Sequence, residues 1–214
     1  TKRVYRRPKL LHQPLLFLAT NGNGAMLRAS VSWGELNSRY DALLAANLRP
    51  NIPEDRWIMF SRCRAWIVFQ GFSQEISKDC LDLFHSANGL RGFWRFHIPT
   101  GQGEHVVITI GVEMIPRENG IRLAFHRHPA KGVKERLADE KEVRLILRPD
   151  IESRNFHDTT KAYTGPEHRF LKAVTNHSDG FTFTPDSEHS LQVNVSRGEF
   201  VWEPEWRYMV RRSV

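Results

Sequence analysis

Hydrophobic and polar residues alternate with a period of two along most of the chain. The clearest run is Glu104–Ile115, where Val106, Ile108 and Ile110 fall on one face and His105 falls on the other. Because successive side chains of a strand point to opposite faces, this run predicts a strand. Similar runs predict strands at Leu15–Leu18, Met26–Trp33, Trp57–Phe60, Ala65–Phe69, Phe93–Ile98, Ile121–His126, Val143–Leu147, Phe181–Thr184, Leu191–Val195 and Phe200–Trp206.

Turn signals separate most of these runs, for example Thr100–Gly103, Glu118–Gly120 and Ser178–Gly180. Many short strands joined by turns predict an all-β fold, because each sheet must bury one face against another layer. We therefore expect a large antiparallel β-sandwich with little helix. With 214 residues and 40% hydrophobic content, the chain is long enough for one sizeable core, and we expect a single domain over residues 1–214.

Three segments depart from the alternation. Asp41–Leu48 is almost uniformly apolar, so periodicity alone does not distinguish a buried strand from a helix. Ser77–Phe84 predicts one helix of about two turns, which spans roughly seven residues. Gly132–Lys141 is rich in charge and predicts a loop with a short helix.

The segment Thr20–Leu48 carries the most specific motif of the chain. A turn at Asn21–Gly24 is followed by Ala29-Ser30-Val31, then by Arg39-Tyr40 and Leu43-Leu44. This order resembles the opening of the N-terminal domain of bacterial and archaeal glycogen debranching enzymes of the amylo-1,6-glucosidase type. Two later segments resemble the same family in the right order. They are Leu147-Arg148-Pro149 with Arg154-Asn155-Phe156-His157, and the aromatic stretch Trp202–Val210.

The sequence departs from the family pattern at three places. Asp41-Ala42 stands where the family more often shows His-Gly, and Ser38 replaces the first of two arginines. We place Gln70–Gly103 on no segment of the family pattern, so the resemblance implies no role for it.

The resemblance implies a β-supersandwich in which Asp41–Leu48 is a buried strand. It also implies that the polypeptide was cut from a longer enzyme after Val214, where a catalytic (α/α)6 barrel would follow. Such an enzyme hydrolyses α-1,6 branches of glycogen or related α-glucans. We accordingly assign no catalytic residue, no cofactor and no metal to this chain. Its expected partners are an α-glucan and the barrel of the same chain, and we expect the fragment alone to be inactive.

Sugar recognition combines aromatic faces, which stack on pyranose C–H groups, with planar polar groups that hold hydroxyls. Trp33, Arg39 and Tyr40 lie close together in sequence, and Arg154 and His157 belong to a segment that the resemblance places in the same domain. These five residues are our candidate substrate-binding residues. The alternative is that such an Arg or Tyr anchors a loop by hydrogen bonding.

Charge and cysteine content narrow the remaining alternatives. The net charge of +7 raises the question of nucleic acid, and the tightest basic clusters are Arg3, Arg6 and Arg7 at one end and Arg207, Arg211 and Arg212 at the other. The remaining basic residues are spread out, so we do not expect nucleic acid as the partner. A nucleic-acid-binding β-domain and a stand-alone carbohydrate-binding domain remain the alternatives.

Only two cysteines, Cys63 and Cys80, are present, which predicts buried thiols and a reducing cytoplasm, although one disulfide between them stays open. No apolar run approaches the roughly 20 residues that span a bilayer, so we expect no membrane partner.

Two further groups of residues have side chains of the types found in metal sites and in glycosidase active sites. His126 and His128 share a strand face at a spacing that metals accept, but no third ligand is evident. Glycoside hydrolysis usually needs two carboxylates about 5 to 10 Å apart. Acidic pairs occur at Asp79 and Asp82, Glu113 and Glu118, Asp139 and Glu140, and Glu203 and Glu205. Each pair reads more simply as solvated charge on a loop or strand face.

Overall fold

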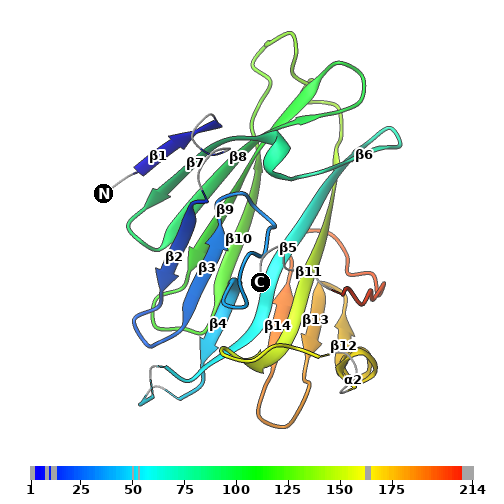
Figure 1. The fold of residues 1–214 in the computed structure, drawn as a ribbon. Coiled ribbons are helices and arrows are strands. Elements are labelled where there is room, and N and C mark those ends of the chain that lie inside the picture. The colour runs from blue at the N-terminus through cyan, green and yellow to red at the C-terminus, as the bar shows by residue number, and fades with distance from the viewer. Residues whose placement is uncertain are drawn as a thin grey trace.

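The computed structural model describes residues 3–7, 10, 14–49, 51–52, 54–161 and 165–208, and it is an all-β fold with three antiparallel sheets (Figure 1). The first sheet has the strand order β1-β7-β8-β9-β10. Its strands are β1 (Arg3–Arg6), β7 (Leu81–Ala87), β8 (Arg91–Pro99), β9 (His105–Met114) and β10 (Ile121–Arg127). The predicted fold class is confirmed.

The second sheet has the order β11-β5-β4-β3-β2, with β6 also paired to β5. Its strands are β2 (Leu16–Thr20), β3 (Met26–Ser30), β4 (Ala42–Asn47), β5 (Arg56–Phe69), β6 (Phe72–Glu75) and β11 (Arg144–Asn155). The third sheet consists of β12 (Val174–His177), β13 (Gly180–Phe183) and β14 (Leu191–Asn194). A 3-10 turn, η1 (Lys78–Cys80), precedes β7, and a short helix, α2 (Pro166–Lys172), precedes β12.

The core lies between the two large sheets. Phe17 of β2 packs edge-on against Trp94 of β8, with ring centroids 5.7 Å apart. The indole Nε1 of Trp94 donates to the carbonyl of Val31 at 3.0 Å, so this buried polar group is satisfied. The same hydrophobic cluster includes Phe181 and Phe183 of the third sheet. Burial of these aromatic faces is the main stabilising contribution that the sequence provides.

Two sequence predictions hold in detail. The Asn21–Gly24 segment is the turn between β2 and β3: Asn21 Oδ1 accepts the backbone N–H groups of Asn23 at 2.8 Å and Ala25 at 3.0 Å. Gly22 and Gly24 have φ values of 85° and 91°, a region that favours glycine. The apolar segment after Asp41 forms β4, and all six of its residues are buried, as expected of a central strand.

The long strand β5 joins two runs that we predicted as separate strands, Trp57–Phe60 and Ala65–Phe69. The residues between them continue the alternation, because Cys63 lies in the core while Arg62 and Arg64 lie on the opposite face. β11 likewise extends beyond the predicted Val143–Leu147 and passes through Pro149. A proline is tolerated there because β11 is an edge strand and pairs only with β5.

Three sequence predictions are wrong. Ser77–Phe84 does not form a two-turn helix, because Leu81–Ala87 pairs with β1 and β8 on its two sides and the tertiary pairing overrides local propensity. Gly132–Lys141 forms turns without a helix. Phe200–Trp206 forms no strand. Pro204 within it lacks an N–H donor, and the segment is held by side-chain contacts, such as the 3.4 Å ion pair between Glu203 and Arg148.

Besides β7, four elements were not predicted from the sequence, namely β1, β6, α2 and β12. The three strands have four residues each and α2 has seven, so none of them carries a strong periodic signal. Arg211 and Arg212 of the predicted C-terminal basic cluster, and the end of the Trp202–Val210 segment, lie outside the described residues.

Candidate functional site

The loop Ser32–Asp41 connects β3 to β4 and carries three of the five candidate residues. The carboxylate of Asp41, whose side chain is 1% exposed, accepts the backbone N–H groups of Asn37 at 2.6 Å and Ser38 at 2.8 Å. It also forms an ion pair with Arg28. Because this buried charge has several partners, it fixes the end of the loop. The aspartate that replaces the family's more common histidine therefore has a structural role here.

One cluster of planar side chains forms at the Asp41 end of this loop. The ring of Tyr40 lies 4.7 Å from that of Phe156, measured between centroids, and the Tyr40 hydroxyl is 3.4 Å from Nδ1 of His157. The guanidinium carbon of Arg39 lies 5.1 Å from the centroid of the Tyr40 ring, within cation–π range. We call Arg39, Tyr40, Phe156 and His157 the ring cluster. Arg39 and His157 are exposed, Tyr40 is half-buried and Phe156 is buried.

Arg154 lies behind the ring cluster rather than on its surface. The residue is 5% exposed, and its guanidinium donates to the backbone carbonyls of Arg39 at 2.7 Å and Asp158 at 2.9 Å. It also pairs with Glu152. These contacts tie the end of β11 to the Ser32–Asp41 loop. The sequence left two roles open for Arg154, sugar contact and loop anchoring, and these contacts indicate loop anchoring.

Trp33 occupies the other end of the loop, apart from the other four candidate residues. It is only 4% exposed, and its ring packs edge-on against Trp94 with centroids 5.2 Å apart. Its backbone φ is 26°, a region that a bulky residue rarely adopts. Its indole Nε1 is buried and has no hydrogen-bond partner within the described part of the chain. The buried ring leaves no free face for a sugar to stack on.

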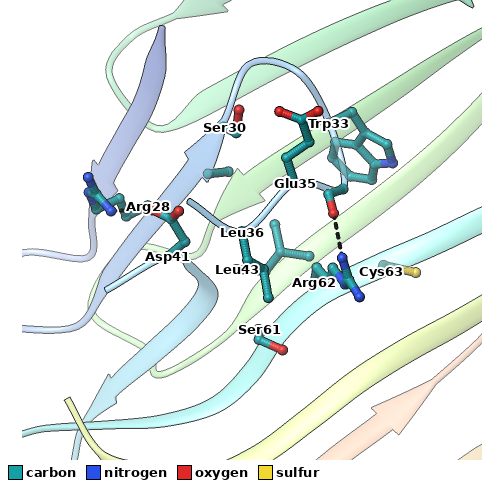
Figure 2. Close-up of a pocket in the computed structure, with 12 residues that line it drawn as sticks. Arg28, Ser30, Trp33, Glu35, Leu36, Asp41, Leu43, Ser61, Arg62 and Cys63 are labelled. Carbon is teal, nitrogen blue, oxygen red and sulfur yellow. Dashed lines mark hydrogen bonds and ion pairs between the residues drawn. The ribbon is translucent and has the colours of Figure 1, made fainter. Parts of the chain in front are cut away.

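A small cavity separates this end of the loop from β5 (Figure 2). Figure 2 shows Trp33 and Leu36 of the loop above Ser61 and Arg62 of β5, and Arg62 donates to the carbonyl of Gly34 at 2.8 Å. The volume of the cavity is about 20 Å³, which fits about one water molecule and excludes a sugar.

A larger cleft of about 470 Å³ opens next to this cavity, on the outer face of β5. We call it the β5 cleft. Four parts of the chain line it, namely Ser32–Leu36, Arg62 and Arg64 of β5, Glu75–Asp79, and Arg207 with Tyr208. Sequence reasoning missed it because these parts are far apart along the chain. The local signal was a pair of arginines, Arg62 and Arg64, inside a largely apolar strand.

The two β5 arginines are held in place by Asp150 of β11. Arg62 Nε lies 2.6 Å from one carboxylate oxygen of Asp150, and Arg64 Nη2 lies 2.9 Å from the other. Arg64 also reaches Glu205 at 3.5 Å, and Arg148 reaches the same Glu205 at 3.3 Å. A shared network of this kind limits the motion of the guanidinium groups that face the cleft.

Every acidic pair considered for catalysis has a member with a structural partner. The members paired with arginine are Asp82 with Arg95, Glu113 with Arg91, Glu203 with Arg148, and Glu205 with Arg64 and Arg148. Asp139 accepts the backbone N–H of Ala130 at 2.8 Å. These contacts agree with the interpretation of the pairs as structural or solvated charges.

The structure places two more histidines near His126 and His128. The rings of His97 and His105 stack at 5.2 Å, and those of His126 and His128 lie 4.9 Å apart. Burial, followed by neighbouring positive charges, lowers the pKa of His128, and the hydroxyl of Thr109 lies 2.7 Å from its Nε2. Despite the four imidazoles, no group of three potential metal ligands forms within the described residues.

The cysteines form no disulfide, and both are buried. Burial raises the pKa of the Cys63 thiol to about 12, with a smaller contribution from Asp150. Burial also raises the pKa of Cys80. Because the thiolate is the reactive form, neither cysteine suits a nucleophile.

Comparison with known proteins relates the chain to one protein family. Residues 17–214 match the model of a protein family described as glycogen debranching enzyme N terminal. The matched range contains the Ser32–Asp41 loop, the ring cluster and the β5 cleft. No curated protein and no solved structure gave a match to the chain. Within the described ranges, no helix combines the length and apolar character needed to cross a membrane.

Proposed function

We infer from its membership of the family of glycogen debranching enzyme N-terminal domains that this chain works within an enzyme acting on α-1,6 branches of glycogen or related α-glucans. We propose further that the ring cluster contacts the glucan. The match over nearly the whole chain confirms the family resemblance seen in the sequence.

The observation that carries the glucan-contact proposal is the arrangement of Arg39, Tyr40 and His157 at one surface. Rings and planar guanidinium groups offer stacking faces for pyranose C–H groups, and their nitrogen and oxygen atoms offer hydrogen bonds to hydroxyls. Arg154 and Asp41 hold the backbone beneath this surface. A surface that is already ordered loses less conformational entropy when it binds a ligand.

The bond-breaking step, in this proposal, belongs to carboxylates outside these 214 residues. The domain supplies one wall of the substrate cleft and an interface with the catalytic domain of the same enzyme. For the interface we favour the stretch that contains Val201 and Trp202, which are 59% and 40% exposed. Large exposed apolar side chains that gather in one segment often mark an interaction surface.

Calorimetric titration with a branched malto-oligosaccharide tests the glucan contact. We expect saturable binding that changes little between low and moderate salt, because a neutral glucan displaces few counterions. Arg39→Ala and Tyr40→Ala should each weaken the affinity by about tenfold, the effect of losing one stacking or hydrogen-bond contact.

Two matched variants serve as controls for that titration. Arg122→Ala removes an exposed arginine of β10 whose side chain is 70% exposed, and Trp202→Ala removes an exposed aromatic ring. Neither should change the affinity. Absence of binding would contradict the glucan contact, and affinity that falls steeply with salt would favour a nucleic-acid partner instead.

A further inference from the structure

Trp33 combines two unusual features at the wall of the β5 cleft. Its buried Nε1–H donor has no partner in the described residues, and a buried unpaired donor carries a free-energy cost. Its backbone also adopts a φ of 26°, where strain is expected for a large side chain. Figure 2 shows the indole nitrogen on the side of the ring that points away from Leu36 and Leu43. An acceptor supplied by a ligand would satisfy this donor.

The charges that line the β5 cleft nearly balance. Four basic residues and three acidic residues line it, namely Arg62, Arg64, Lys78 and Arg207 with Glu35, Glu75 and Asp79. A polyanion would approach the three carboxylates, and a polycation would approach the guanidinium groups. Like charges brought together in this way disfavour both ligand types.

Several of these charges already have partners and others do not. Lys78 pairs with Glu35 at 3.0 Å, and Arg62 and Arg64 pair with Asp150. Within the described residues, the carboxylates of Glu75 and Asp79 form no ion pair. The cleft therefore presents free acceptors on these two side chains, and its wall contains Trp33, whose buried indole donor is unpaired.

A hydroxyl group is the simplest partner for such a surface, because it donates to a carboxylate and accepts from an indole N–H or a guanidinium. The hydroxyls of Ser32 and Ser77 add groups of both kinds, and the Tyr208 hydroxyl, which donates to Glu167 at 2.5 Å, adds an acceptor. Tyr208 is 66% exposed and offers an aromatic face to the apolar side of a sugar. The volume of about 470 Å³ lies within the range of small-ligand sites, roughly 300 to 1,000 Å³.

We propose that the β5 cleft is a second saccharide-binding site, separate from the ring cluster. Its ligand is a neutral, polyhydroxylated chain of a few sugar units. The identification of this chain as an α-glucan rests on the proposed function. Because both sites adjoin the Ser32–Asp41 loop, the cleft would give the domain a second point of contact with its substrate.

The indole N–H signals of the full 214-residue chain test this proposal by two-dimensional NMR. The six tryptophans provide six indole signals, and Trp33→Phe identifies the one that belongs to Trp33. Titration with maltotriose should shift the Trp33 signal in a saturable way. Inorganic phosphate and spermidine, added at the same concentrations as an anion and a cation, should leave it unchanged.

Substitution of the free acceptors gives a second test, in which Trp33 itself is unchanged and reports the binding. Glu75→Ala and Asp79→Ala should each weaken the maltotriose affinity measured at the Trp33 signal by about tenfold, the effect of one lost hydrogen bond. Both residues are exposed, so the variants should keep their thermal stability. Glu140→Ala, an exposed carboxylate outside the cleft, should bind as the unchanged chain does.

The outcomes separate this proposal from the glucan contact at the ring cluster. In the Tyr40→Ala variant, the Trp33 signal should still shift with maltotriose. A Trp33 signal that never moves while calorimetry detects binding sensitive to Tyr40→Ala would overturn the cleft site and leave the ring cluster standing. A shift with phosphate or spermidine but not with maltotriose would overturn the assigned ligand class.

Discussion

At the scale of single residues, buried charged groups decide how the Ser32–Asp41 loop is presented. Asp41 and Arg154 are buried charged residues, and their partners include three backbone groups of the loop, those of Asn37, Ser38 and Arg39. Such contacts order the chain more than they add net stability, since desolvation offsets much of the attraction. The exposed side chains of Arg39 and His157 are thereby held on a fixed backbone.

Substitution of Asp41 by alanine tests this anchoring role. The change leaves the Arg28 guanidinium without its partner and removes the acceptor for two backbone N–H groups. We expect the free energy of unfolding to fall by about 3–5 kcal/mol, as for other broken buried pairs. Urea denaturation measures it, with Glu142→Ala as a surface control. A loss below about 1 kcal/mol, within the range of a surface change, would contradict the anchoring role.

The sequence identified four residues that lie together in the fold, but it did not separate their roles. Arg39 and Tyr40 were grouped by proximity in sequence, and a family resemblance added Arg154 and His157. The structure brings these four residues to one place. Whether an arginine is exposed or buried depends on long-range packing, which periodicity does not reveal. Trp33 was grouped with them by proximity in sequence, although the loop carries it to the other end and into the core.

At the scale of elements, cross-strand pairing decided the structure wherever local signals were weak or ambiguous. β4 pairs with β3 and β5 along its two edges, and all six of its residues are buried. Both faces of the strand are therefore covered, which suits its nearly continuous apolar sequence. Leu81–Ala87 has a burial pattern that also suits a helix, and only its pairing with two other strands distinguishes a strand. Long, clearly alternating runs such as β9 were predictable because their pattern fits the period of two of a strand and not the 3.6-residue period of a helix.

Gly180 provides a test of the pairing within the third sheet. A Cβ added at this position would lie 1.9 Å from the carbonyl oxygen of Val193 on β14, so the two strands could not keep their spacing. We expect Gly180→Ala to lower the free energy of unfolding by at least about 2 kcal/mol. Chemical denaturation measures the loss, with Gln192→Ala as the control on an exposed position of β14. Equal stability of the two variants would show that the register of β13 and β14 differs from the one described.

His97 of β8 and His128, which follows β10, predict a dependence of stability on pH. Burial is the main cause that lowers the pKa of His97 and His128, with added contributions from Arg95, Arg136 and the neighbouring imidazoles; Asp82 opposes the effect at His97. Lowered folded-state pKa values mean that the unfolded chain binds protons first. The contribution of the two neutral imidazoles to the free energy of unfolding is therefore complete above about pH 6.5, and it is lost as the pH falls further.

The corresponding measurement is the melting temperature from neutral pH down to about pH 5. The double variant His97→Gln, His128→Gln should lose less stability over this range than the unchanged chain. His168→Gln, whose side chain is 80% exposed, should leave the pH profile as it is. Identical profiles for the double variant and the unchanged chain would refute this account of the sheet.

At the scale of the whole molecule, the two surfaces that we propose for glucan contact adjoin the same Ser32–Asp41 loop, and each acidic pair that we considered for catalysis has a member with a structural partner. In this account the domain binds and presents a glucan while another part of the enzyme cleaves it. The overall β-architecture was predictable because it follows from many short alternating runs. The β5 cleft was not, because it is assembled from segments brought together only by the packing of sheets and loops.

The most direct test of the central claim is sedimentation of the 214-residue chain with glycogen particles, at low and moderate salt, with free glucose assayed in the same supernatant. The account predicts that the chain sediments with glycogen at both salt concentrations and that no glucose is released. A chain that stays in solution, or that leaves the particles as salt is raised, would contradict a glucan-binding role. Released glucose would contradict the placement of the catalytic carboxylates outside this domain.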